Sequence, residues 1–292
     1  MSAPENLPPI YTPSERQWSA SLTLGFDVQN GATRLCERKH RGPLRVQKAL
    51  YPEGERICHA ILLHPPGGIA HGDQLAIGVT VAEGAHALLT TPGAGKWYGN
   101  RDAQLAAAIS RQDVHLTVSA GAKLEWLPQE NIVFYGANAA STLNVHIETG
   151  GSALGWDIIC LGRPRSAAPF TTGRWQQEQH LRYAGKTVFR EQGQLIGGAP
   201  LLTSPIGLAG HTVCATFWWI NEDIDPALLA VLREIPLPAT LRAGTTHLPH
   251  ILLTRVLGND AETVRDYLTK IWHKVREVAY DYPSITPRIW ST

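Results

Sequence analysis

The chain has 292 residues, of which 43% are hydrophobic and only 17% are charged, and its formal net charge is +1. A nucleic-acid-binding protein usually carries a strong basic excess, and a disordered tail combines low hydrophobicity with high net charge, so the composition argues against both classes. The 27 glycines and 20 prolines, with many Val, Ile, Leu and Trp residues, favour a turn-rich β structure.

No feature of the sequence indicates export or membrane insertion. Residues 1–16 lack the basic start and apolar core of a signal peptide, and we predict that they form a flexible segment. No apolar stretch approaches the ~20 residues that a membrane-spanning helix needs. The four cysteines form no Cys-x-x-Cys pair, which argues against a zinc knuckle or a redox motif. We therefore expect a cytoplasmic protein whose cysteines are mostly buried.

Alternating apolar residues predict the first strands. Every second residue from Trp18 to Val28 is apolar, and Asn30-Gly31 then gives the strongest short hairpin signal. A related pattern, apolar-x-apolar-x-x-Gly-small, places a glycine of expected positive φ at each of four turns, namely Gly31, Gly84, Gly121 and Gly150. The repeat predicts a mainly β fold of stacked hairpin layers, each covering the apolar face of its neighbour.

Helix signals appear only late in the chain. Asp225-Pro226 predicts the start of a short helix that ends before Pro236. A clearer helix is predicted over 260–279, where Asn259 and Glu262 have the spacing of a capping box. Its apolar residues share one face that we expect to pack on the body of the protein: Val264, Leu268, Ile271, Trp272 and Val275. We predict one β-rich domain over 17–292, with a helical part from about residue 225.

Four segments are dense in Gly, Pro and functional side chains, and we expect them to gather along one side of the layers. They are 64–73, 90–98, 125–131 and 161–164. The second contains Gly93-Ala94-Gly95-Lys96, but the first glycine of the Walker pattern and the Ser or Thr after the lysine are missing. No serine lies in a G-x-S-x-G elbow. Nucleotide binding and Ser-His-Asp catalysis are therefore not favoured.

Two further functions stay open on the residues alone. A metal-dependent hydrolase could use His64, His71 and Asp73, since imidazole and carboxylate ligands suit zinc or nickel, although we favour their interpretation as two surface loop histidines and a turn-capping aspartate. The nine tryptophans allow a sugar-binding β module. We interpret three of them as core residues instead: Trp97, Trp126 and Trp156.

Three acidic residues lie within otherwise apolar strand segments: Glu130, Asp157 and Glu191. A buried charge needs a partner or a wet cavity. Candidate cationic partners are Lys96, Arg163 and Arg190. The acids either form ordinary ion pairs or line a polar internal path, in the way that carboxylates line cation pathways.

Several motifs together are highly specific. They are Gly42–Gln47, Tyr51–Gly54, Cys58-His59, Leu62–Ile69, Gly72-Asp73, Leu89–Ala94, Leu124–Glu130, Gly155-Trp156 and Cys160–Pro164. In these segments the chain resembles the urease accessory proteins of the UreD family, also called UreH. The family usually has Val-Gly where this chain has Ala70-His71, Phe where it has Trp97, and Arg where it has Asn138. His71 is therefore an extra residue, which weakens its interpretation as a metal ligand of the family.

The resemblance implies a protein without enzymatic activity that acts in nickel insertion into apo-urease. Its implied partners are UreF, the GTPase UreG and apo-urease, in a dimeric hetero-complex formed through UreF. Nickel would pass from UreG through UreF and an internal tunnel to urease, and the implied fold is β-rich and layered. No nucleic acid or membrane is expected as a partner.

A conduit must release its metal, so we expect no tightly bound cofactor and only transient Ni²⁺ held by carboxylates and water. We assign Asp73, Glu130 and Glu191 to this path, with Lys96 and Arg163 as charge partners. The net charge near zero also predicts poor solubility without UreF.

Overall fold

The computed structural model describes residues 17–70, 72–99, 108–163, 168–280 and 282–291, so the segment 1–16 lies outside the described residues. Within them strands dominate, which confirms the mainly β prediction. No helix in these ranges is long and apolar enough to span a membrane.

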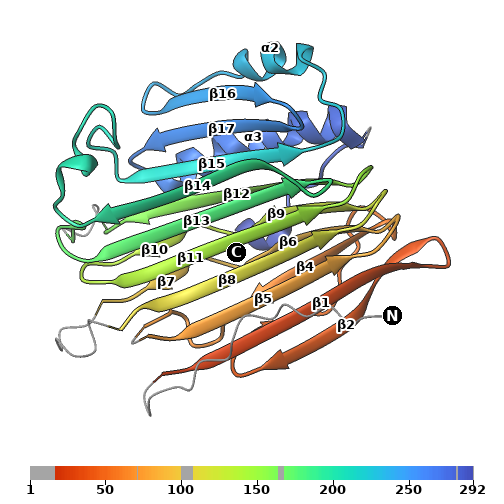
Figure 1. Ribbon diagram of the computed structural model, residues 1–292, viewed down its shortest axis with the longest axis horizontal. Coiled ribbons are helices and arrows are strands. Elements are labelled where there is room, and N and C mark those ends of the chain that lie inside the picture. The colour runs from red at the N-terminus through yellow and green to blue at the C-terminus, as the bar shows by residue number, and fades with distance from the viewer. Residues whose placement is uncertain (1–16, 71, 100–107, 164–167, 281, 292) are drawn as a thin grey trace.

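A seven-stranded sheet forms the front layer of the molecule in Figure 1, in the order β14-β13-β11-β8-β5-β1-β2. Its strands are β1 Ser19–Gln29, β2 Ala32–Arg41, β5 Gln74–Val81, β8 Ser110–Val118, β11 Asn138–Ile147, β13 Arg174–Tyr183 and β14 Lys186–Ile196. The strands β1, β5, β8, β11 and β13 run parallel, and β2 and β14 lie antiparallel at the two edges.

A ten-stranded sheet lies behind the first, with β16-β17-β15-β12-β9-β6-β4-β3 as its main order and β10 pairing with β12 and β7. Its strands are β3 Arg45–Val46, β4 Ile57–Leu63, β6 His86–Thr90, β7 Gly95–Trp97, β9 Lys123–Leu127, β10 Asn131–Val133, β12 Ser152–Leu161, β15 Val213–Ile220, β16 Arg242–Leu248 and β17 Ile251–Gly258. The strands β4, β6, β9 and β12 are parallel. Their residues are buried almost throughout, as expected for strands covered on both faces.

The predicted turns separate into two kinds. Asn30 and Gly31, with φ of 53° and 77°, close the β1–β2 hairpin as predicted. Gly84, Gly121 and Gly150 also have positive φ, but they lead from β5 to β6, β8 to β9 and β11 to β12, which are strands of opposite sheets. The hairpin prediction is therefore wrong at these three turns, because alternation does not distinguish a neighbour in one sheet from a strand in the facing sheet. The layers still stack, and Gly121 N–H donates to the Gly150 carbonyl at 3.1 Å.

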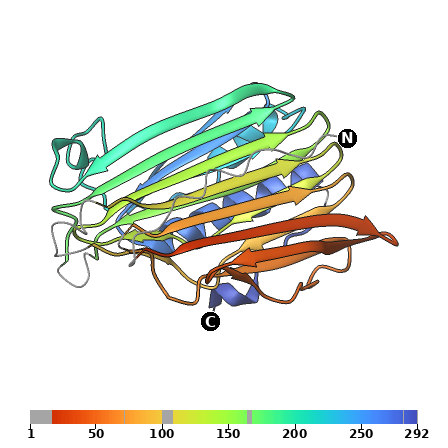
Figure 2. The ribbon, with the colours of Figure 1, turned by 60° about the horizontal axis from the view of Figure 1, so that its bottom comes forward.

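Two apolar cores result from this arrangement. One lies between the sheets, and the other lies between the ten-stranded sheet and the helices α2 Ala227–Arg233 and α3 Ala261–Tyr280. All five apolar residues predicted to share a face of α3 are buried, which confirms its packing on the body of the protein (Figure 2). The cap of α3 is Asp260, which accepts from Thr263 N–H at 3.0 Å, rather than the predicted Asn259. The described residues also include the 3₁₀ turns η2 Pro200–Leu202 and η3 Arg288–Ser291.

Candidate functional site

The four polar, glycine-rich segments lie side by side at one end of the ten-stranded sheet, as predicted. Strand β7 pairs in parallel with β10, and β10 pairs in parallel with β12. Backbone hydrogen bonds join the first three segments, from Ile69 N to Lys96 O at 2.7 Å and from Gly95 N to Glu130 O at 2.8 Å. The fourth segment bonds just beyond the third, from Gly162 N to Val133 O at 2.8 Å. Pro164 lies outside the described residues.

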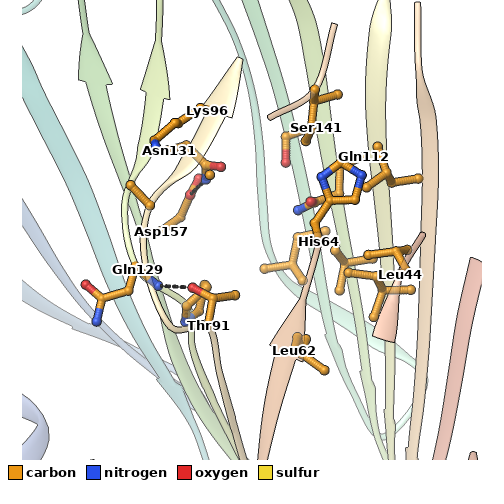
Figure 3. A pocket seen from close by; sticks show the side chains of 18 of the residues that line it. Leu44, Leu62, His64, Thr91, Lys96, Gln112, Gln129, Asn131, Ser141 and Asp157 are labelled. Carbon is orange, nitrogen blue, oxygen red and sulfur yellow. Dashed lines mark hydrogen bonds between the residues drawn. The ribbon is translucent and has the colours of Figure 1, made fainter. Parts of the chain in front are cut away.

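A cavity of about 260 Å³ lies between the sheets beside these segments. Figure 3 shows His64, Gln112 and Ser141 on one side of it, facing Asn131 and Asp157 on the other. Burial lowers the pKa of His64, against the opposing effect of the nearby Asp73 carboxylate, so its imidazole is neutral near pH 7. These polar side chains share the wall of the cavity with apolar residues such as Leu44 and Ile77.

Asp157 is the acidic residue at the centre of this region. It lies on β12 and accepts hydrogen bonds from Asn131 Nδ2 at 3.2 Å and from Gln177 Nε2. Burial raises the pKa of Asp157 to about 6, and the negative charge of Glu191 adds to the rise, whereas hydrogen bonds from Asn131 and Gln179 oppose it. Gln179 is only 1% exposed, and its Oε1 has no hydrogen-bond partner among the described residues. A buried acceptor without a donor is suited to a water molecule or a cation.

A second cavity, of about 460 Å³, adjoins the first, and Asp157 and Gln177 line both. Glu191 and Arg255 also line it and form an ion pair at 2.7 Å. Cys214 faces the same space, and burial raises the pKa of its thiol to about 12, so the sulfur stays protonated. Four polar side chains lie among the mostly apolar residues that line the two cavities, and we call them the polar track: Asp157, Gln177, Gln179 and Glu191.

The track has no closed metal cage. Among the described residues, no group of three or more His, Cys, Asp or Glu side chains could hold a metal ion. Carboxylate and amide oxygens bind nickel less strongly than imidazole or thiolate ligands do.

The predicted site residues do not all reach this track. Glu191 and Lys96 line the second and the first cavity, respectively. Asp73 instead holds a turn, because its two carboxylate oxygens accept the backbone N–H groups of Trp18 and Ala70, both at 3.0 Å. The hydrolase hypothesis named three residues. The structure describes His64 and Asp73, and His71 lies outside the described residues.

The predicted charge partners of the acids are wrong. Glu130 pairs with Arg265 of α3 at 3.0 Å, and Glu191 pairs with Arg255 of β17, rather than with Lys96 or Arg163. The guanidinium of Arg163 lies over the Phe134 ring, 5.0 Å from its centroid, and Arg190 pairs with Glu178. The actual partners belong to C-terminal elements that no local pattern places beside the acids. The three tryptophans interpreted as core residues are buried, which confirms that interpretation: Trp97, Trp126 and Trp156.

Sequence reasoning missed a buried ion cluster on the opposite face of the ten-stranded sheet, under α3. The Arg276 side chain lies 2.6 Å from Glu53 and 3.3 Å from Glu125. His59 contacts Glu53 and His86 contacts Glu125, both at 2.7 Å, and Trp272 Nε1 donates to Glu125 at 2.6 Å. This ion cluster joins α3 to the sheet.

The electrostatics of the ion cluster favour ionised carboxylates. Burial opposes the ionisation of Glu53 and Glu125, but hydrogen bonds and the Arg276 charge outweigh it and lower both pKa values. Burial also lowers the pKa of His86, against the opposing hydrogen bond to Glu125. The sequence signals for this cluster were an acidic residue in the otherwise apolar strand segment that contains Trp126 and the family motifs that contain Glu53 and His59.

Comparisons with known proteins decide the family. A family model described as "UreD urease accessory protein" matches residues 19–291. The chain belongs to the UreD urease accessory protein family. A urease accessory protein UreD of Janthinobacterium sp. (strain Marseille) is 44% identical over 281 residues, which cover 96% of this chain and 93% of that protein. UreD of Dechloromonas aromatica (strain RCB) is 44% identical over 290 residues, with 97% of each chain covered. UreD of Pseudomonas savastanoi pv. phaseolicola is 42% identical over the full length of both chains.

The motifs that carry the UreD resemblance divide between two places in the structure. Residues of 64–69, 91–96 and 128–131 line the first cavity. Glu53, His59 and Glu125 belong to the ion cluster under α3. One set of motif residues therefore lines the first cavity, and the other attaches the C-terminal helix that covers the back of the same sheet.

Proposed function

We propose that this protein is a cytoplasmic urease maturation factor without enzymatic activity. With UreF and the GTPase UreG it delivers nickel to apo-urease, in a dimeric hetero-complex formed through UreF. The observation that carries the proposal is a pair of adjoining cavities that share the Asp157 carboxylate, inside a chain of the UreD family. We expect no tightly bound cofactor, because nickel is the cargo.

Nickel moves between the two cavities past Asp157 and Glu191. The Asp157 carboxylate is ionised above its pKa of about 6 and supplies the negative charge that attracts the ion. The oxygens of Gln177 and Gln179 replace part of the hydration shell of the ion. Because Cys214 stays protonated, it does not trap nickel as a thiolate would.

The other predicted path residues act around this track. Asp73 and Glu130 hold the segments beside the first cavity in place, through the Trp18–Ala70 turn and through Arg265. Lys96 is exposed and lines the first cavity, where its positive charge weakens cation binding and so favours release.

The function is tested in a urease activation assay that contains apo-urease, UreF, UreG, GTP, bicarbonate and nickel. Omitting this protein is expected to abolish activation, and equal activation without it would refute the proposal. A pull-down with UreF tests the partnership directly. Stoichiometric zinc that survives washing with a chelator would instead support the metal-dependent hydrolase.

The role of the track is tested by Asp157→Asn, which removes the charge and keeps the shape of the side chain. The matched control is Asp113→Asn on β8, whose carboxylate lies 3.9 Å from Arg111 and outside both cavities. We expect lower activation with Asp157→Asn, unchanged activation with the control and unchanged UreF binding with both. Equal activation by the two variants would remove Asp157 from the path.

A further inference from the structure

The connection between β14 and β15 is an unusual surface loop. Residues 197–212, which we call the 197–212 loop, contain no Asp, Glu, Lys or Arg. The loop projects beyond the strand ends in both views of the molecule (Figures 1 and 2). Ile206 is 95% exposed at its surface, and Leu201 is 43% exposed beside it. An apolar side chain that projects so completely is poorly placed to stabilise the isolated fold.

The 197–212 loop is nevertheless held in one shape by its own backbone. Its hydrogen bonds include Ser204 N to Pro200 O at 2.9 Å, Leu208 N to Leu201 O at 3.0 Å and Gly210 N to Leu202 O at 2.8 Å. A Cβ at Gly207 would lie 2.1 Å from the Leu201 carbonyl oxygen, so this tight packing requires glycine. A rigid loop loses little conformational entropy on binding, which favours its use as a contact surface.

The position of the loop links it to the polar track. Leu201, Gly207 and Leu208 line the second cavity, so the loop forms part of its rim. Arg242 and Arg255 also line this cavity and are exposed. Glu191 neutralises Arg255, and Arg242 adds a positive charge to the rim. A protein bound to the loop would therefore cover this side of the track.

We propose that the 197–212 loop is a docking site for a partner protein that has an apolar pocket for Ile206, flanked by carboxylates that face Arg242. The inference rests on the proposed function, because it places a partner over the cavity through which nickel would pass. A buried aliphatic anchor within a rim of complementary charge is a common arrangement in protein interfaces. A lipid surface is disfavoured, since the loop has no basic residue to contact anionic headgroups.

The experiment measures the affinity of the full chain for UreF and, separately, for apo-urease by biolayer interferometry. Ile206→Asp is expected to weaken binding to one of the two by at least about tenfold, and Arg242→Glu is expected to weaken the same complex. The control is Val28→Asp, at a 43% exposed site beside the β1–β2 turn, which is expected to leave both affinities unchanged. Because Ile206 is almost fully exposed, its substitution is expected to leave the melting temperature unchanged.

Three results would overturn the inference. The first is wild-type affinity of Ile206→Asp for both proteins. The second is flotation of the wild type, but not of Ile206→Asp, with phosphatidylcholine–phosphatidylglycerol vesicles, which would identify a lipid surface. The third is a dimer of the wild type that Ile206→Asp converts to a monomer in analytical ultracentrifugation, which would identify a second copy as the occupant. If the wild type activates urease and one of these results is found, only the inferred docking site is refuted. If urease is activated equally well without this protein, the proposed function is refuted.

Discussion

Replacing Arg276 with methionine is the sharpest test of how the C-terminal helix is attached. Arg276 is 0% exposed and is the cation that lies between Glu53 and Glu125 in the ion cluster. Methionine keeps much of the side-chain volume but leaves two buried carboxylates without their shared cation. The substitution therefore isolates the charge of Arg276 from its packing.

The expected loss of stability follows from the burial of Arg276 and its two carboxylate partners. Removing one partner of a buried ion pair costs about 3–5 kcal/mol, because the remaining charge is left in a medium that solvates it poorly. Domains are usually stable by about 5–15 kcal/mol, so Arg276→Met is expected to lower the urea midpoint strongly. The control is Lys274→Met on the same helix, which breaks the exposed Lys274–Glu277 pair and should cost less than about 1 kcal/mol.

The pH dependence gives a second signature. In the wild type, the lowered pKa values of Glu53 and Glu125 stabilise the fold above the ordinary glutamate pKa, and this stability is lost as the pH falls through the lowered values. Without Arg276 the two carboxyl groups lose their cation, so their pKa values rise. The free energy of unfolding that Arg276→Met removes is therefore greatest near neutral pH. The difference in the free energy of unfolding between Arg276→Met and the wild type is expected to become smaller from pH 7.5 to pH 5.

The assay is urea unfolding followed by circular dichroism at both pH values. Equal losses of stability for Arg276→Met and Lys274→Met would refute the argument that the ion cluster holds α3 in place. The electrostatic explanation would be refuted if Arg276→Met and the wild type differed by the same free energy of unfolding at pH 7.5 and at pH 5.

Two further predictions concern strand β12 and the cavity it lines. Gly155→Ala is expected to destabilise the protein, because a Cβ there would lie 2.6 Å from a buried tryptophan ring, whereas Gly78→Ala has open space and should not; equal melting temperatures would contradict this. Asp157→Asn is expected to raise the urea midpoint at pH 7.5 but not at pH 4, because the pKa raised to about 6 means that the native state loses stability as the pH rises through that value. An unchanged midpoint at pH 7.5 would contradict the raised pKa of Asp157.

Local patterns were sufficient where one face of an element is buried. The alternation in β1 predicts its buried residues from Ala20 to Phe26, and the helical spacing predicts the buried face of α3. The same alternation fails at its ends, where Trp18 and Val28 are exposed. Trp18 precedes the first residue of β1 and Val28 lies beside the Asn30-Gly31 turn, and the alternation does not report their exposure.

Long-range pairing was beyond the sequence for a physical reason. The pairing of Glu130 with Arg265 and of Glu125 with Arg276 depends on where α3 crosses the sheet. Strand order decides this crossing, and the glycine turns do not reveal whether the chain stays in one sheet or passes to the other. The motif residues could therefore be selected from the sequence, but their division between the polar track and the ion cluster could not.

The most direct test of nickel passage through the interior is to block the track. Gly193 lines the second cavity, and a Cβ built there meets no atom within 4 Å, so Gly193→Leu adds a bulky side chain to the wall of this cavity. Gly78→Leu adds the same side chain on β5, outside both cavities, and also meets no atom within 4 Å. The nickel content of urease is then measured after activation with each variant. We predict low nickel with Gly193→Leu and full nickel with Gly78→Leu at equal UreF binding, and equal nickel loading by the two variants would contradict the conduit.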